Sequence, residues 1–310
     1  MKLLLILALL APTALQAEKN WTFEGGANLN FSWTANENFI GMNNSPFINP
    51  AGSINFAANY KDMPHEWRNR ISWSLGYNYS PPPKIFVKNV DVLKFQSEYF
   101  YHIKPNTGFF GSLKLRTSAL PSKNFEKGTT YIINDVRTGK QIDKVGPTNQ
   151  FYLSDAFAPL FLEQWAGFFT RPVDEKHWFL EFKVAAVGRE NFADNQRVIT
   201  CYSCTNPQVE QLINVYELGP GASLLFKAFF FEKKLSYLLE ADFTWIGLQE
   251  PVIRPINSFS RVSYDINNIL AFHALSWLSL NWNLRLIGNP AVLDKPQFLS
   301  TVSLAAHHIF

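Results

Sequence analysis

The sequence predicts an all-β fold, a transmembrane antiparallel up-and-down β-barrel of about 12 strands. Three observations lead to this prediction. Apolar and polar residues alternate one for one over many separate stretches, which is the periodicity of β-strands. Short and long connections between these stretches alternate along the chain, and aromatic residues gather near the ends of the stretches. Two unequal rims and two aromatic belts are typical of barrels in bacterial outer membranes.

The first stretch, residues 21–33, shows the alternation most clearly. Its odd positions, from Trp21 to Trp33, carry mainly aromatic and aliphatic side chains, and its even positions carry polar ones such as Glu24 and Asn28. A water-soluble sheet would turn the apolar face inward, whereas a membrane barrel turns it towards lipid. We expect the second arrangement, with the even residues facing the lumen.

The remaining elements follow in order. The regular alternating stretches are 21–33, 53–60, 67–78, 93–102, 112–116, 178–184, 217–230, 235–245 and 278–286, and the less regular ones are 159–171, 262–275 and 297–310. The short connections are 61–66, 104–106, 172–175, 231–234 and the passage near Ser276. The longer ones are 35–50, 120–158, 189–214, 247–261 and 290–296, with 80–84 a brief exception. With both termini on the short-turn side, this layout predicts an even-stranded meander.

The chain opens with MKLLLILALLAPTALQA, in which Lys2 precedes an apolar run and small residues lead up to Ala17. This pattern predicts a secretory signal peptide over residues 1–17. We therefore expect residues 18–310 to form the barrel domain, in the outer membrane of a Gram-negative bacterium. The net charge of +3 comes from scattered basic residues, which predicts no nucleic-acid partner.

Aromatic residues near the strand ends are expected to form two belts at the membrane interfaces. The expected periplasmic belt comprises Trp21, Tyr60, Trp67, Tyr101, Phe109, Trp178, Phe230 and Tyr237, and the expected outer belt comprises Trp33, Tyr77, Trp245 and Tyr264. The last strand ends in Phe310, which resembles the signal that barrel-assembly machinery reads. The expected partners are therefore outer-membrane lipid and this machinery.

The polar faces of the strands carry many charged residues, which we expect to line the lumen. They are Glu24, Arg68, Arg70, Lys94, Glu98, Lys114, Arg116, Glu181, Lys183, Glu217, Lys227, Glu240, Asp242 and Arg285. In a lumen of about twelve strands, charges of opposite sign would pair and avoid unpaired burial. The same residues could also form a small gated or weakly selective pore. The two interpretations are compatible.

Cys201 and Cys204 form a C-Y-S-C motif in the expected outer loop 189–214. In an oxidising compartment we expect them to form a disulfide. The segment offers no helix for a thioredoxin-like redox pair. A zinc site would need further ligands, and the nearest histidines, His177 and His273, lie in other segments. The sequence predicts no metal site and no cofactor.

No catalytic residues are expected. Asp265 and His273 share a face of one strand but would be about 26 Å apart, and Glu98 and His102 would be about 13 Å apart by the same measure. A constellation drawn from several strands stays open, so a lipid-modifying enzyme is kept as an alternative.

The long loop 120–158 contains two short β-type runs around Arg137, Thr138 and Gly139. We expect an outer hairpin that either extends the barrel strands or folds over the mouth as a lid or plug.

Several stretches resemble a family of outer-membrane proteins of unknown function that is common in Bacteroidetes-type bacteria. They are NLNFSWTANENF (28–39), WSLGYNYS (73–80), GSLKLRTSA (111–119) and LSDAFAPLFLEQWAGFFTRP (153–172). A further family motif, Asn-Trp-x-x-Gly-Gly, is matched only loosely by NFIGMNNS (38–45), where Phe39 replaces the Trp. The resemblance implies a barrel fold and a membrane location, and it supplies no catalytic residues.

The expected function is non-enzymatic: a small pore, or a transport protein for a solute or ligand. The alternatives are a structural or adhesive barrel that works through its outer loops and the lipid-modifying enzyme named above. The sequence does not identify the solute.

Overall fold

The computed structural model describes residues 20–37, 47–80, 85–124, 128–193, 195–201, 206–252, 261–288 and 296–309. The expected signal peptide, the motif at 38–45, Cys204 and Phe310 lie outside the described residues, as do the side chains of Trp33 and Cys201. The disulfide and the assembly signal therefore stay predictions. No helix in the described ranges is long and apolar enough to cross a membrane.

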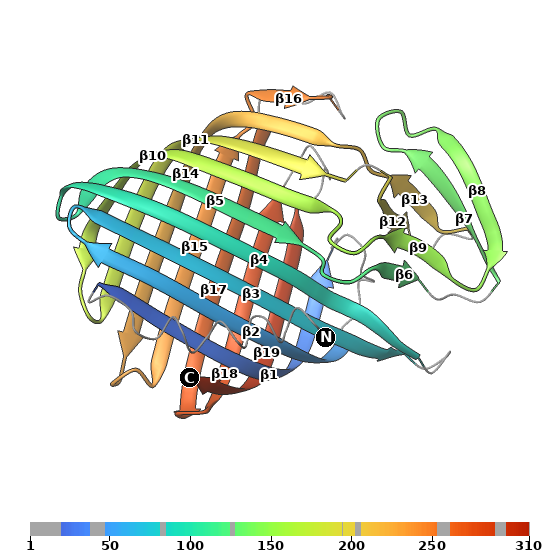
Figure 1. The fold of residues 1–310 in the computed structure, drawn as a ribbon. Helices are drawn as coiled ribbons and strands as arrows, with labels where there is room; N and C mark the ends of the chain where they lie inside the picture. The colour runs from blue at the N-terminus through green and yellow to red at the C-terminus, as the bar shows by residue number, and fades with distance from the viewer. Residues whose placement is uncertain are drawn as a thin grey trace.

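Twelve strands form one closed antiparallel ring (Figure 1). In ring order they are β1 (Trp21–Glu37), β2 (Phe47–Asp62), β3 (His65–Ser80), β4 (Ile85–Lys104), β5 (Thr107–Thr117), β10 (Leu160–Asp174), β11 (Trp178–Phe192), β14 (Val215–Phe230), β15 (Leu235–Trp245), β17 (Val262–Leu275), β18 (Leu278–Gly288) and β19 (Gln297–Ile309). Strand β19 pairs with β1, with Ile309 opposite Gly26, and this pairing closes the ring. The predicted fold class and strand number are confirmed.

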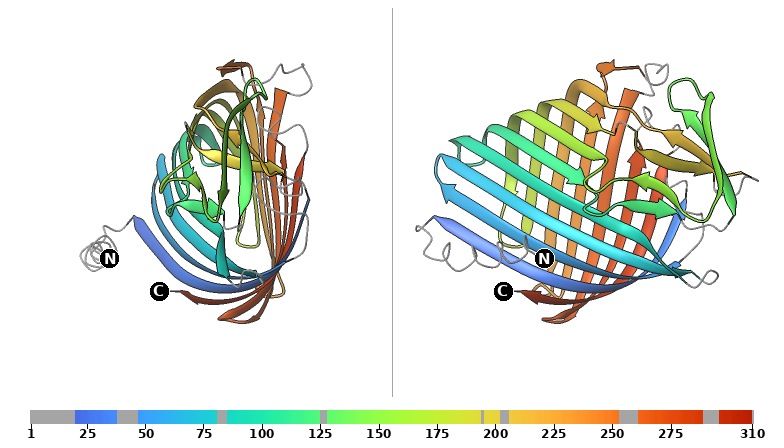
Figure 2. Two further views of the ribbon diagram at one scale, coloured as in Figure 1. Left: turned by 90° about the vertical axis from the view of Figure 1, so that its right-hand side faces the viewer. Right: turned by 45° about the vertical axis from the view of Figure 1, so that its right-hand side comes forward.

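The two ends of the ring differ as the sequence predicts. Tight turns join β2 to β3, β4 to β5, β10 to β11, β14 to β15 and β17 to β18 at one end, which we call the tight-turn end. The connections from β5 to β10 and from β11 to β14, as far as they are described, lie at the other end, which we call the outer end, at the right of Figure 1. Figure 2 shows the strands of the two walls crossing each other, because strands must tilt for a sheet to close into a barrel.

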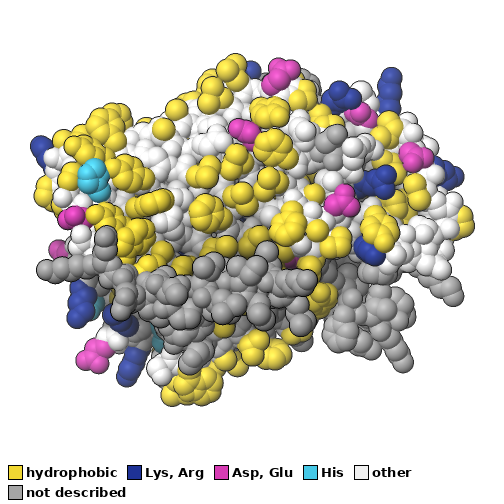
Figure 3. All heavy atoms as spheres, in the orientation of Figure 1, with side chains coloured by type: hydrophobic (Ala, Val, Ile, Leu, Met, Phe, Trp, Pro, Cys, Tyr) yellow, Lys and Arg dark blue, Asp and Glu magenta, His cyan; other side chains and the backbone are white. Residues whose placement is uncertain are grey.

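The outer face of the ring is apolar. Alternate positions carry exposed large hydrophobic side chains, among them Leu29 and Phe31, which are 66% and 64% exposed. On the face seen in Figure 3, Lys and Arg side chains gather towards the two ends of the molecule. A soluble monomer rarely exposes so large an apolar surface. Lipid covers such a surface in a membrane, and the closed ring leaves no unpaired strand edge there. The ring is therefore a transmembrane barrel.

Aromatic side chains contact one another along the outer face at the tight-turn end. The ring of Trp21 lies 5.3 Å from that of Tyr60 and 6.1 Å from that of Trp67, measured between centroids. Trp178 contacts Phe230 at 5.2 Å. These residues belong to the belt expected on the periplasmic side, where amphipathic rings favour the headgroup region.

The two longest connections fold together into a small sheet structure at the outer end, which we call the outer unit. Its strands are β6 (Ser122–Asn124), β7 (Thr129–Asp135), β8 (Gln141–Thr148), β9 (Phe151–Ser154), β12 (Arg197–Cys201) and β13 (Gln208–Gln211). Strands β12, β13, β7 and β8 form one sheet, in which β13 and β7 run parallel, and β6 pairs with β9. A further short strand, β16 (Leu248–Glu250), pairs with the outer end of β14.

The outer unit has its own hydrophobic core. Tyr131, Ile133, Phe151, Ile199 and Val209 are buried together, and the rings of Tyr131 and Phe151 stack 4.2 Å apart. The expected hairpin within 120–158 is present as β7 and β8, but it does not extend the barrel strands. It pairs instead with the segment 206–211, because the apolar face of β7 is buried only when Val209 and Ile199 cover it.

The turn between β7 and β8 is held by one carboxylate. The side chain of Asp135 accepts hydrogen bonds from the backbone nitrogens of Arg137 and Thr138 at 2.8 and 3.0 Å, and Gly139 adopts the left-handed conformation with φ of 64°. The side-chain hydrogen bond from Arg137, followed by the backbone bonds, lowers the pKa of Asp135 below its ordinary value. The turn therefore keeps its charged cap until the pH falls below the usual range of an aspartate.

Replacing Val209 with Ala tests whether the outer unit is one cooperative structure. Losing two buried methyl groups should cost about 2 kcal/mol. Limited proteolysis of the folded protein should then cut the hairpin 129–148 faster, although Val209 lies in a different segment. Ile142→Ala, at an exposed position of β8, is the matched control and should change the cleavage rate little. Faster cleavage confined to 206–214 would contradict a shared core.

Candidate functional site: the inner face of the barrel

The inner face of the ring is identified by contacts between strands that are not neighbours. Arg68 on β3 lies 3.5 Å from Glu181 on β11, and Lys114 on β5 lies 2.8 Å from Asp242 on β15. Such strands can touch only through the interior, so these side chains point inward. The registers place the other charged positions expected in the lumen on the same face of their strands.

A buried set of charges, which we call the inner ion network, fills one side of the interior at the tight-turn end. It comprises Glu66, Arg68, Glu98, His102, Arg171, Glu181 and Lys183. Arg171 is 1% exposed, and it donates hydrogen bonds to Glu66 and Glu181 at 2.6 Å each. Lys183 pairs with Glu98 at 2.7 Å. His102 contacts the same Glu66 carboxylate oxygen as Arg171, at 2.9 Å. Each buried carboxylate thus has a cationic partner, as burial of a charge requires.

Aromatic rings pack against this network. Phe100 is fully buried, and the guanidinium groups of Arg68 and Arg171 lie 4.8 and 4.6 Å from its centroid, with the Lys183 ammonium at 5.1 Å. Phe169 meets Phe100 edge to face at 5.0 Å. Cations over an aromatic face in a site of low polarity contribute about 2 kcal/mol each.

Several of these inward residues are not among those predicted from the sequence: Glu66, Phe100, Phe110, Trp165, Phe169 and Arg171. They occupy the same alternate positions of their strands as the inward charges, so the alternation itself is consistent with an inward direction. The prediction assigns apolar side chains to lipid, whereas in this barrel aromatic residues also occupy the inner face. The stretch 159–171 looked irregular for this reason.

A second cluster lies farther towards the outer end. Glu163 accepts a hydrogen bond from Arg189 at 2.6 Å and one from the indole nitrogen of Trp165 at 2.7 Å. It also lies 3.5 Å from Lys114, which holds Asp242 on the other side. The cluster therefore links strands β5, β10, β11 and β15 through the interior.

Glycine at position 221 makes room for the Trp165 ring. A β-carbon on Gly221 would lie 2.9 Å from that ring and 2.5 Å from a methyl group of Val187. Trp165 starts on β10 and reaches β14 across β11, so the bulky ring occupies space that the small residue leaves. The filled part of the interior thus extends along β10, β11 and β14.

Other inward charges have local partners. Arg285 on β18 donates to both carboxylate oxygens of Asp265 on β17, at 2.8 and 2.5 Å. Gln249 on β16 donates to Glu217 on β14 at 2.9 Å. These pairs join neighbouring strands and do not bridge opposite walls of the barrel.

Among the charged residues whose side chains are described, five point into the barrel and are exposed to solvent: Glu24, Arg70, Lys94, Arg116 and Glu240. Glu24 and Arg70 flank Ala57 in one lateral row near the tight-turn end. Lys94 on β4 and Arg116 on β5 stand opposite each other in the strand register, near the outer end. Solvent therefore reaches the inner face at both ends of the ring.

Uncharged polar side chains dominate the remaining inner wall, which also includes the charged residues Glu24, Asp265 and Arg285. Its side chains, on β1, β2 and β17–β19, include Asn28, Asn30, Ser53, Asn55, Asn59, Asn267, Asn281, Asn283 and Ser303. Small hydroxyl and amide groups hydrate readily and occupy little space. One side of the interior is therefore filled by rings and ion pairs, and the other is lined by short polar groups.

One pair of inward residues could in principle carry nucleophilic chemistry. The hydroxyl of Ser236 lies 3.1 Å from Nε2 of His273, across strands β15 and β17. The pair faces the interior, which a membrane lipid on the outer face cannot reach. Asp265, which shares a strand with His273, is engaged by Arg285. Among the described residues, no three His, Cys, Asp or Glu side chains are grouped to hold a metal ion.

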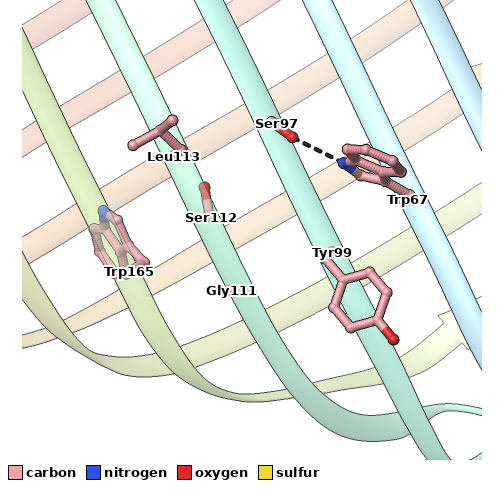
Figure 4. A pocket seen from close by; sticks show the side chains of 7 residues that line it. All are labelled: Trp67, Ser97, Tyr99, Gly111, Ser112, Leu113 and Trp165. Carbon is pink, nitrogen blue, oxygen red and sulfur yellow. Dashed lines mark hydrogen bonds between the residues drawn. The ribbon is translucent and has the colours of Figure 1, made fainter.

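A shallow recess in the wall is lined by Trp67, Ser97, Tyr99, Gly111, Ser112, Leu113 and Trp165 (Figure 4). The indole nitrogen of Trp67 donates to the hydroxyl of Ser97 at 2.8 Å. The wall is one sheet thick and Gly111 has no side chain, so the inward residues Ser112 and Trp165 border a recess whose other residues face outward. The recess lies on the lipid-covered surface and does not belong to the lumen.

Part of the chain resembles a known protein family in sequence. Residues 33–122 match the model of a family described as Protein of unknown function (DUF3078). The match includes the stretches 73–80 and 111–119, so the expected resemblance to a family of unknown function is confirmed there, whereas 153–172 lies outside it. No curated protein matches the sequence.

Solved structures with a similar fold are outer-membrane proteins. An outer membrane channel from Pseudomonas putida F1 is 12% identical with a TM-score of 0.43, over 94% of this chain and 97% of that one. The NanC porin is 5% identical with a TM-score of 0.42, over 90% and 98%. The CymD monoaromatic hydrocarbon channel is 11% identical with a TM-score of 0.41, over 97% and 92%. Likeness at this level concerns the fold alone.

Replacing Arg171 with Met tests the inner ion network. The substitution leaves Glu66 and Glu181 buried without their principal partner, which should cost about 3–5 kcal/mol of unfolding free energy. Urea unfolding in lipid vesicles, followed by tryptophan fluorescence, measures the loss.

Two further variants test whether unpaired buried charges cause this loss of unfolding free energy. Arg137→Gln removes an exposed ion pair with Asp135 and should cost at most about 1 kcal/mol. Adding Glu181→Gln to Arg171→Met should restore part of the stability, since it removes an orphaned charge. Equal losses in the Arg171 and Arg137 variants would contradict a buried network.

Proposed function

We propose that this protein is a channel of the bacterial outer membrane, in which small polar solutes cross through the interior of the barrel. The observation that carries the proposal is the solvent exposure of inward-pointing charges at both ends of the ring. Glu24 and Arg70 are exposed near the tight-turn end, and Lys94 and Arg116 near the outer end. Charges that only braced a closed wall would be buried and paired, as they are in the inner ion network.

The shape of the interior supports a narrow path. A ring of about twelve strands is wider than barrels filled entirely by side chains and narrower than open porins of about sixteen strands. The inner ion network and its aromatic rings occupy the side formed by β3–β5, β10 and β11. The path would therefore follow the wall of β1, β2 and β17–β19, where short uncharged polar side chains predominate and suit small hydrated solutes.

Enzymatic activity is not part of the proposal. The Ser236–His273 pair is the described arrangement that comes nearest to a nucleophile and base. A hydroxyl bonded to an imidazole also serves as an ordinary polar pair of a hydrated wall, and its inward position separates it from membrane lipid.

Two neighbouring alanines test the path. Ala57 faces inward between Glu24 and Arg70, whereas Ala58 faces lipid. In planar bilayers the wild-type protein should conduct, and Ala57→Trp should lower the single-channel conductance by a large fraction because the ring obstructs the lumen. Ala58→Trp adds the same ring at the lipid interface, where Trp is favoured, and should conduct like the wild type. No conductance from folded wild-type protein at any voltage would refute a channel, and equal effects of the two variants would refute the path past Ala57.

The outer unit favours a second function, adhesion through the outer loops, because its separate core presents a folded surface beyond the barrel. Deleting residues 120–158 distinguishes the two functions. Loss of cell-surface binding with unchanged conductance would assign adhesion to the outer unit. Unchanged surface binding after the deletion would remove this alternative.

A further inference from the structure

We infer that Lys94, Arg116 and Arg285 form a binding site for small anions inside the barrel near its outer end. The preferred solutes would carry a carboxylate or phosphate group. This inference rests on the proposed channel and names the chemical class of its solute.

The first observation is a pair of like charges without partners. Lys94 on β4 and Arg116 on β5 stand directly opposite each other in the register, so their β-carbons are about 5 Å apart. Both side chains are exposed, and within the described part of the chain neither has an ion-pair partner. Like charges directly opposite each other destabilise a sheet unless each has a partner of opposite charge. Asp242 and Asp265 also stand opposite each other, but Lys114 and Arg285 pair with them.

The second observation is a third cation from the far wall. Arg285 lies on β18, which is well removed from β4 and β5 around the ring. Lys114, two positions before Arg116 on the same face of β5, contacts Asp242 on β15 across the interior at 2.8 Å. Asp242 stands opposite Asp265, the residue that Arg285 binds. The left view of Figure 2 shows the same arrangement, in which the wall containing β4 and β5 faces the wall of β17–β19. Arg285 is therefore held on the wall that faces Lys94 and Arg116.

The third observation is that two of these cations are held in place. Both oxygens of Asp265 bind Nε and Nη2 of Arg285, which orients the guanidinium and leaves Nη1 for another acceptor. The guanidinium of Arg116 lies 4.7 Å from the ring centroid of Phe161, and this contact fixes its plane. A ligand would therefore meet preset donors, which reduces the entropy lost on binding.

Nearby carboxylates do not neutralise the site. Asp265 is engaged by Arg285, and Glu163 is shared by Arg189 and Lys114. Glu240 is the inward carboxylate of the same lateral row as Asn267 and Arg285, and Asn267 donates to it at 3.4 Å. Two uncompensated cations therefore face one carboxylate, and the local field stays positive.

This arrangement suits a particular ligand chemistry. Guanidinium groups bind the oxygens of carboxylate and phosphate with paired hydrogen bonds, and the lysine adds a point charge. Phe161 gives the site one apolar edge beside Arg116. The narrow lumen restricts the ligand to small soluble anions.

The first experiment measures ion selectivity. In planar bilayers under a KCl gradient, the reversal potential of the wild-type channel should favour chloride, and millimolar citrate or inorganic phosphate on the outer side should reduce the chloride current. The Lys94→Gln, Arg116→Gln double variant should shift the reversal potential towards the cation side and lose the block. Lys176→Gln, in the exposed turn before β11, removes a charge outside the lumen and should behave like the wild type. A cation-selective wild type, or a double variant with unchanged selectivity, would overturn the inference.

The second experiment measures binding without conductance. Isothermal titration of citrate into the folded protein in detergent should give binding that weakens at least about tenfold in the double variant, since the variant loses two cationic hydrogen-bond donors. Heat-modifiable gel migration verifies that the variant is folded. If the wild type binds citrate but conducts nothing, the channel fails and the anion site stands. If it conducts but citrate binds neither protein, the anion site fails and the channel stands.

Discussion

Closure of the hydrogen-bonded ring is the constraint on which the rest of this structure depends. Inside a hydrocarbon layer no water can satisfy a peptide group, and each unpaired group costs several kcal/mol. The pairing of β1 with β19 and of β11 with β14 removes every free edge of the twelve-stranded sheet. The wall is consequently a single sheet, so each side chain on a barrel strand faces either lipid or the interior. The apolar outer face and the charged inner face are two results of the same closure.

The interior then has to accommodate charge in a confined space, and it does so in two ways. At the tight-turn end, Arg171 and its carboxylates are buried and matched, and Phe100 packs against the guanidinium, so that this side of the barrel is filled. Near the outer end, Lys94 and Arg116 are exposed and unmatched. Matched burial stabilises the wall, whereas unmatched charge in a hydrated lumen has an electrostatic cost that only a mobile counter-charge offsets. The contrast between the two regions is the physical basis of the functional proposals.

The outer unit shows a different kind of dependence. Its sheet joins β7 to β13, which belong to connections separated by the two barrel strands β10 and β11. Those strands bring the two connections to the same end of the ring. Once they are adjacent, Tyr131 and Val209 can bury each other's apolar surface, and neither connection could do so alone. The barrel thus supplies the proximity, and hydrophobic burial supplies the stability.

The sequence by itself determined the strand type, the strand number, the alternation of tight and long connections and the inward direction of charges such as Lys114 and Glu181, because a period of two is a local property of the chain. The tertiary structure alone decided which inward residues meet. Arg171 reaches Glu66 and Lys114 reaches Asp242 only because the ring brings together strands that are remote in sequence. The inward direction of Phe100 could not be predicted from the sequence either. An apolar side chain on a barrel strand is compatible with lipid or with a packed interior, and only its neighbours across the lumen distinguish the two.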